Sequence, residues 1–547
     1  MKKIKRKNNT MRQNKYNIYL PVLFALVLIT GIYMGVKIIK AGQGTKNRIF
    51  TLKQYHDKLH DVVQFIEQDY VDSVSSVELK EIAIKAMLKT LDPHSHYFSS
   101  EEIKAENERL AGNFEGIGIE FRVIDDTIVV MHVIPGGPSE KIGLRSGDRI
   151  VGIGDELVAG VNISNTDVVK KLKGERRTKV KVSVLRSKVK KTIDFIITRN
   201  IIPLYSVDVS YMVDDKIGYI KLSKFSATTP DEFDEAIIIL KSKGMEKLIV
   251  DLRGNAGGYL KSAIDLADEF LKNDELIVYT EGINRPRQYA YATKKGRFEN
   301  EEVVFLIDEG SASASEIVAG AIQDNGRGMI IGRRSFGKGL VQEQLDLFDG
   351  SAIRLTVARY YTPTGRCIQK SYENGAKDYH EEYYRRFVNG EVEHPDSIKF
   401  ADSLKYITSG GKVVYGGGGI MPDVYVPLRS GNEYIYYNKL INNGLVYRFA
   451  FQYTDRQRSD LEEKYAVVDD YIEGFLIDEQ LFWDFIRFAE DDGVERDKLG
   501  IKTSEEKIKT LLKAFIGRNI HNDKAFYPIY NESDSIFLKA YQLLSLS

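Results

Sequence analysis

Apolar residues recur with different periods along the chain, and each period predicts a different kind of element. From Phe50 to about Ala111 they recur every three or four residues, which predicts a small helical segment. Between Asn113 and Arg199 the period falls to two, which predicts a compact module of short strands. After Ile202 strands and helices alternate, which favours a largely parallel sheet covered by helices.

The pattern changes again beyond Ile368. A polar, tyrosine-rich stretch at about 371–410 interrupts the alternation and is expected to be a loop or insertion. The string GGGGIMPDVYVP then predicts a returning strand, and helical periodicity resumes from Glu433 to the end. We expect the tail to form an accessory helical domain, to which no chemistry is assigned.

A basic stretch and an uncharged run open the chain. The run extends from Ile18 to Val36, and at about 1.5 Å per residue it just crosses a bilayer core of roughly 30 Å. The basic flank predicts a transmembrane signal anchor with the body on the non-cytoplasmic side, periplasmic in a Gram-negative bacterium. No A-x-A-like site follows closely, which favours an uncleaved anchor over a removed signal peptide. The basic residues are Lys2, Lys3, Lys5, Arg6, Lys7, Arg12 and Lys15.

Composition excludes several classes of function. Lys plus Arg and Asp plus Glu number 78 each, so the formal net charge is zero and nucleic acid is not an expected partner. The single cysteine, Cys367, cannot form an internal disulfide, and the eight histidines contain no HExxH motif. We therefore expect neither a metal nor another cofactor.

The strand-rich module contains a glycine loop just before a strand. The loop consists of Gly116, Ile117, Gly118 and Ile119, whose backbone N–H groups can hold the terminal carboxylate of a peptide that adds a strand to the sheet. The triplet GIG alone is more typical of a tight turn. The longer string VIPGGPSEKIGLRSGDRIVGIGDELV resembles the signature of PDZ domains and favours a PDZ-like peptide-binding module.

Ser313 lies between the apolar strand VVFLID and a predicted helix. A nucleophile there is close to unpaired N–H groups and to the positive end of the helix dipole, both of which stabilise an oxyanion. Ser313 and Glu316 also fit S-x-x-E, a capping box that requires no chemistry. On this feature alone we favour the cap.

Lys338 lies between two glycines, and Gln342 follows four positions later. Taken alone, Lys338 is typical of an exposed turn lysine, and Gly339 replaces the Ser or Thr of a P-loop. A general base near neutral pH requires its pKa to fall from about 10.4 by roughly two to three units, which burial can supply. The string DLRGNAGG from Asp251 carries amides that could face the same site, and it fits a packing turn equally well.

Several strings together resemble one family. SASASE, FGKGxVQ, LRxNxGG, LDPHSHYF and the PDZ-like module resemble the C-terminal processing peptidases, a serine peptidase family, over roughly residues 50–430. The resemblance implies that Ser313 is the nucleophile, that Lys338 is its general base and that Gln342 orients the lysine. Ser311 and Ser315 are then neighbours of the nucleophile.

The resemblance also implies an oxyanion hole made of backbone N–H groups. One N–H comes from Ala314 and the other from the glycine turn. In that turn Gly257 is favoured, and Gly258 remains a candidate. The expected substrates are proteins or peptides with accessible C-termini. The N-terminal helices are expected to pair two chains in a homodimer, on the resemblance alone.

The expected fold is thus a multidomain α/β (α+β) protein. Its expected parts are a basic flank and anchor at 1–40, a helical segment at 49–111, a PDZ-like domain at 112–200, a serine peptidase core at 201–430 and a helical domain at 431–547. A catalytically inert PDZ-type scaffold is the alternative, against which the intact serine and lysine motifs argue. A Ser-His-Asp hydrolase is disfavoured because Ser313 lacks the G-x-S-x-G context and no histidine follows it within the α/β motifs.

Overall fold

The computed structural model describes residues 19–42, 57–186, 189, 191–398, 401–428 and 434–546. The chain divides into two compact units, residues 1–83 and 84–547. The first contains α1 (Leu20–Gly42), α2 (Lys58–Asp69) and the start of α3 (Ser76–Lys89). Within the described residues we find no helix with the length and apolar character needed to cross a membrane. The expected span at 18–36 lies within these residues except for Ile18, and α1, which covers most of it, does not meet this requirement.

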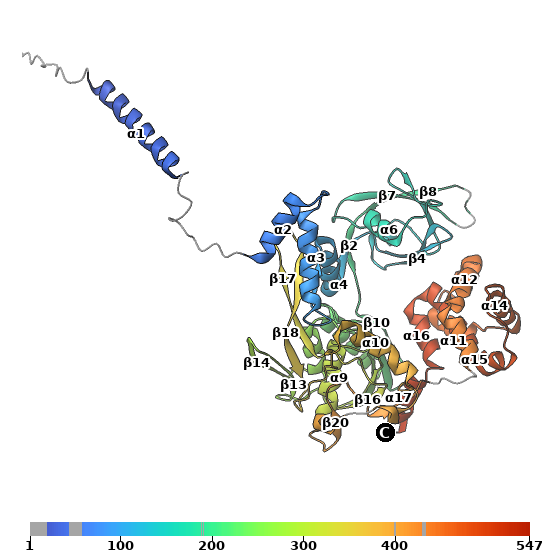
Figure 1. The fold of residues 1–547 in the computed structure, drawn as a ribbon. Coiled ribbons are helices and arrows are strands. Elements are labelled where there is room, and N and C mark those ends of the chain that lie inside the picture. Colours follow the sequence, from blue (N-terminus) through green and yellow to red (C-terminus); the bar gives the residue numbers. More distant parts are fainter. Residues whose placement is uncertain are drawn as a thin grey trace, which may run out of the picture. The chain divides into compact units, whose positions relative to one another are not determined.

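A strand-rich module follows α4 (Ser100–Ala111) in the second unit (Figure 1). Its sheet has the order β3-β4-β5-β7-β8, and β6 pairs with β5. Among the described residues β3 pairs only with β4 and so has one free edge, which is the geometry that an added peptide strand requires. The module consists of β3 (Ile119–Ile124), β4 (Thr127–Val133), α5 (Pro138–Lys141), β5 (Arg149–Ile153), β6 (Glu156–Leu157), α6 (Asn165–Leu172), β7 (Lys179–Leu185) and β8 (Ile193–Thr198).

A short ribbon joins the module to the rest of the unit. Strands β2 (Asn113–Gly116) and β9 (Asn200–Pro203) pair antiparallel where the chain enters and leaves the module.

The central sheet has the order β10-β11-β12-β15-β16-β21 and is parallel except for the β10–β11 pair. Its middle strands are continuous apolar runs, as expected for strands covered on both faces. The strands are β10 (Val207–Met212), β11 (Ile217–Leu222), β12 (Lys247–Asp251), β15 (Glu302–Ile307), β16 (Met329–Gly332) and β21 (Val424–Tyr425).

Different helices cover the two faces of this sheet. Alternate residues of β12, Leu248 and Val250, pack with α7 (Thr229–Ser242), α8 (Leu260–Asp268) and α9 (Ala314–Asp324). Ile249, between them, points to the opposite face of the sheet. There it belongs to a second apolar core, to which α17 (Ser535–Leu546) contributes. The expected parallel sheet is present, and the last helix of the chain completes it.

A second sheet has the order β1-β18-β13-β14, with β17 also paired to β18. The polar stretch expected as loop or insertion contains α10 (Gly375–Val388), whose Tyr379 and Arg386 are buried seven positions apart, two helical turns, on one face. The strands are β1 (His96–Phe98), β13 (Leu276–Gly282), β14 (Arg285–Tyr291), β17 (Leu340–Asp346), β18 (Ala352–Tyr361) and the hairpin pair β19 (Lys405–Ile407) and β20 (Val413–Tyr415).

The tail forms helices around an apolar core of its own, and α17 then joins the central sheet. The mixed helix-and-sheet multidomain fold expected from the sequence is confirmed. The remaining helices are α11 (Ile435–Asn442), α12 (Leu445–Lys464), α13 (Val468–Gly474), α14 (Glu479–Asp491), α15 (Lys498–His521) and α16 (Asp523–Asn531).

Candidate active site

Ser313 occupies the turn between β15 and α9. Its backbone has φ 55° and ψ −111°, a conformation that is costly for a residue with a side chain. Strain of this kind is concentrated at functional sites, where the surrounding structure maintains it. The neighbouring hydroxyls of Ser311 and Ser315 donate hydrogen bonds to the carbonyl oxygens of Leu252 and Asn255, each at 2.8 Å. They anchor the turn to the glycine-rich segment.

The carboxylate of Glu316 joins the serine turn to the lysine loop. It is fully buried and accepts hydrogen bonds from the backbone N–H groups of Ser313 (2.8 Å), Gly337 (2.7 Å) and Lys338 (2.8 Å) and from the hydroxyl of Ser335 (2.5 Å). Burial raises its pKa, and the four donors oppose that rise. Sequence reasoning recognised Glu316 only as part of a capping box, because its other donors lie 19 to 22 residues further along the chain.

Lys338 extends into the site from a loop between glycines. Its Nζ donates to Gln342 Oε1 at 3.1 Å, and Gln342 Nε2 in turn donates to the carbonyl oxygen of His94. Burial, followed by the charge of Arg354, lowers the pKa of Lys338 to about 8. This is the shift that a lysine base needs near neutral pH.

Two side chains that the sequence did not single out hold the lysine loop. The hydroxyl of Tyr360 donates to the carbonyl oxygens of Ser313, at 3.1 Å, and Lys338. Arg386 of α10 donates to the carbonyl oxygens of Ser335, at 2.7 Å, and Phe336, at 3.1 Å. Within the part of the chain that the structure describes, no hydrogen bond joins Lys338 Nζ to the Ser313 hydroxyl.

A cavity of about 850 Å³ brings the predicted residues together. It is lined by Ser313, Ala314, Lys338 and Gln342, with Gly258 on the glycine turn. The serine, the amine and the amide that contacts it therefore face one space that is large enough for several residues of an extended peptide.

The glycine turn approaches the serine closely. Gly257 has φ 96°, and a Cβ there would lie 2.8 Å from the Cβ of Ser313. The Gly257 N–H donates to Asn255 Oδ1 at 2.9 Å, so in this arrangement it is already engaged. Gly258 and Ala314, the other two candidates for the oxyanion hole, line the cavity. Asn255 also accepts a hydrogen bond from the Ala312 N–H at 2.9 Å through its carbonyl oxygen.

The predicted peptide loop lies at the start of the free-edged strand β3. Gly118 has φ 77°, and Ile117 is buried in the core of the module. Ser139 of α5 donates through its N–H (3.1 Å) and its hydroxyl (2.6 Å) to the carbonyl oxygen of Ile117, which fixes the loop. Gly116 and Ile119 belong to β2 and β3 on either side of it.

The chain matches several family models. Residues 216–377 match peptidase family S41, and residues 116–197 match the PDZ domain. Residues 27–102 match the N-terminal domain of the activating protease CtpB, and residues 436–522 match a family of unknown function.

Several similar proteins are named as C-terminal processing proteases. The carboxy-terminal-processing protease of Bartonella bacilliformis is 36% identical over 63% of this chain and 80% of its own length. The carboxy-terminal processing protease CtpA of Bacillus subtilis is 36% identical over 57% of this chain and 66% of its own length, just under two thirds. A solved photosystem II D1 C-terminal processing protease is 27% identical, with 68% of this chain and 86% of that chain covered and a TM-score of 0.35. The chain belongs to the carboxy-terminal processing proteases of peptidase family S41.

Proposed function

We propose that the chain is a serine endopeptidase that cleaves peptide bonds by acyl transfer. The observation that carries this proposal is one cavity lined by both Ser313 and Lys338, a partly buried lysine whose pKa is lowered to about 8. Ser313 Oγ attacks the peptide carbonyl carbon while the neutral Lys338 amine takes the hydroxyl proton and later gives it to the leaving amine. Water then attacks the acyl ester and releases the new C-terminus.

Backbone donors complete this chemistry. The N–H groups of Ala314 and of Gly258 or Gly257 stabilise the tetrahedral oxyanion, where each donor is typically worth about 3 kcal/mol. Gln342 orients the amine, because it already binds Lys338 Nζ and is itself held by the backbone of the LDPHSHYF segment. The inert scaffold is disfavoured, since a non-catalytic fold has no need of a strained serine beside a desolvated lysine.

We further propose that substrates present exposed C-terminal or unstructured segments. The free edge of β3 and the glycine loop before it provide the strand pairing and the carboxylate donors for such a segment. Capture there raises the local concentration of the rest of the substrate near the cavity.

The location and assembly of the protein are proposals from the sequence alone. The basic flank and the uncharged run support a membrane anchor with the body outside the cytoplasm, periplasmic in a Gram-negative bacterium. Pairing of two chains through the N-terminal helices stays a prediction from the family resemblance.

Labelling by a fluorophosphonate probe tests the nucleophile. Mass spectrometry of the digested protein is expected to place one adduct on Ser313, and Ser313→Ala is expected to abolish it. Ser242→Ala provides the control, because Ser242 is an exposed serine of α7 whose hydroxyl donates to the carbonyl oxygen of Ile239 in the same helix. An adduct elsewhere, or an unlabelled wild-type chain that cleaves no unstructured protein, contradicts the proposal.

The pH dependence of cleavage tests the base. Only the neutral amine accepts a proton, so kcat/KM is expected to fall about tenfold per pH unit below pH 8 and to level off above about pH 9. His94 is not expected to contribute to the pH dependence of kcat/KM. Burial lowers its pKa to about 3, so it stays neutral between pH 6 and 9. An inflection above pH 10, or a rate independent of pH between 6 and 9, contradicts the assignment of Lys338.

A further inference from the structure

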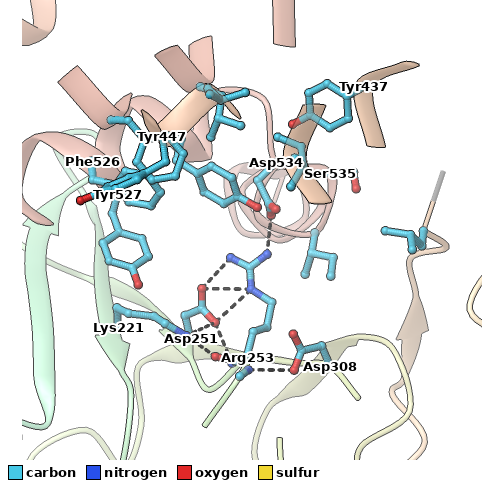
Figure 2. Close-up of a pocket in the computed structure, with 18 of the residues that line it drawn as sticks. Lys221, Asp251, Arg253, Asp308, Tyr437, Tyr447, Phe526, Tyr527, Asp534 and Ser535 are labelled. Carbon is cyan, nitrogen blue, oxygen red and sulfur yellow. Dashed lines mark hydrogen bonds and ion pairs between the residues drawn. The ribbon is translucent and has the colours of Figure 1, made fainter. Parts of the chain in front are cut away.

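A buried arginine lies in the turn that carries the oxyanion glycines. Arg253 follows β12, and its guanidinium donates to the Asp251 carboxylate at 2.5 to 3.0 Å. It also donates through Nη1 to Asp534 Oδ1 at 2.6 Å, as Figure 2 shows. The second partner comes from a residue 281 positions later in the chain.

Asp534 is placed by the docking of α17. Its Oδ1 accepts the N–H of Phe537 at 2.8 Å and so caps the first turn of the helix. Phe537 and Leu544 of the same helix are buried against the second face of the central sheet. The carboxylate can therefore reach Arg253 only while the helix covers that face.

Asp534 is one of two carboxylates that contact the Arg253 guanidinium. Lys221 Nζ contacts Asp251 Oδ1 at 3.3 Å and also donates to the carbonyl oxygen of Arg253. Asp251 is therefore shared between Lys221 and Arg253, and Asp534 is a second carboxylate on the arginine. Loss of the Asp534 charge leaves the guanidinium, whose side chain is only 11% exposed, with a carboxylate that it shares with Lys221, which is costly where little water screens the charge.

The cluster continues into the catalytic turn. The next residue, Gly254, donates its N–H to Asp308 Oδ1 at 2.8 Å. Asn255 then contacts the serine turn, and the Gly257 carbonyl oxygen accepts the N–H of Phe225 at 3.0 Å. Arg253 is thus four and five residues from the glycines that carry the proposed oxyanion donors, on one continuously hydrogen-bonded segment.

We propose that Asp534 is a positioning residue for the oxyanion hole. By holding Arg253, the docked helix α17 fixes the 251–258 turn and so the N–H group that binds the developing oxyanion. The inference rests on the proposed peptidase function and assigns the C-terminal helix a role in that chemistry. Asp534 acts through Arg253 and does not touch the substrate.

Kinetics of Asp534→Asn in the full-length protein test this role. Asparagine retains the helix cap but loses the charge, so kcat is expected to fall about 10- to 100-fold while KM stays within twofold, because the oxyanion exists only in the transition state. A peptide boronate forms a tetrahedral adduct with Ser313, so the affinity for it is expected to fall by the same factor as kcat. Asp534→Glu is expected to recover part of kcat. All rates are expressed per active site titrated with the fluorophosphonate probe.

Asp478→Asn is the matched control. Asp478 caps α14 in the same way, accepting the N–H of Leu481 at 2.8 Å, and it lies in the helical tail. We expect it to leave kcat unchanged. Equal kcat values for Asp534→Asn and the wild type, or equal losses in both asparagine variants, overturn the inference.

Hydrogen exchange separates this inference from the proposed function. Peptides covering residues 251–258 are expected to exchange faster in Asp534→Asn than in Asp478→Asn, whether or not the protein cleaves peptides. If the wild type neither cleaves nor is labelled, the proposed function fails. Equal exchange in the two variants shows that Asp534 does not hold the turn.

Discussion

Replacement of Lys338 by alanine is expected to lower kcat by about 10²- to 10⁴-fold while the protein stays folded. The loss follows because no other group takes the Ser313 proton when the amine is absent. Lys338→Arg is expected to be equally inactive, because a guanidinium keeps its proton at every accessible pH. Cleavage of a fluorogenic peptide measures both variants, and circular dichroism checks the fold.

Lys261→Ala is the control for this comparison. Lys261 also lines the cavity, but its side chain is 83% exposed and its amine is paired with Asp265. We expect its kcat to lie within twofold of the wild type. If Lys338→Ala keeps a comparable rate, the serine and lysine do not act as a dyad.

Replacement of Glu316 by alanine is expected to unfold or grossly inactivate the protein. Four donors lose their acceptor in a fully buried site, and each unsatisfied buried group costs about 1 to 3 kcal/mol. Glu316→Gln retains the shape, but its NH₂ group replaces one oxygen and then faces a backbone N–H. We therefore expect an intermediate loss of stability and a lower kcat, measured by thermal unfolding and peptide cleavage.

Glu343→Gln removes an exposed carboxylate from the strand that follows the lysine loop. Its ion pair with Arg285 is solvent-exposed and is expected to contribute little to stability. A Glu316→Gln variant with the melting temperature and kcat of Glu343→Gln would show that the buried carboxylate does not couple the serine and lysine loops.

The sequence motifs identified the groups that carry out the chemistry better than the groups that hold them. Ser313, Lys338 and Gln342 lie in short strings whose family resemblance is specific, and the structure places all three on one cavity. Glu316 was visible as a local cap. Its contacts with the lysine loop depend on tertiary packing, which no local pattern reports. Tyr360 lies in β18 on the same side of the alternation as Arg354 and Thr356, so the pattern predicts neither its burial nor its hydroxyl contacts.

The same limit applies to the fold. Alternating strands and helices predicted the parallel sheet, because continuous apolar strands require cover on both faces. They did not predict that α17 covers the second face of the sheet, because the sequence of an amphipathic helix does not specify which sheet it packs against. The polarity of residues 371–410 suggested a loop or insertion, whereas α10 within that stretch buries Arg386 against the carbonyl oxygens before Lys338.

The contact between Arg253 and Asp534 also bears on the order of synthesis. A ribosome makes β12 nearly three hundred residues before it makes α17, so the nascent chain holds the serine, the lysine and the glycine turn while one face of the sheet is still bare. Contacts so distant in sequence form late because closing the intervening loop costs entropy. Proteolytic competence would then arise only after α17 has emerged from the ribosome and docked, which protects the partly made chain and its neighbours from premature cleavage.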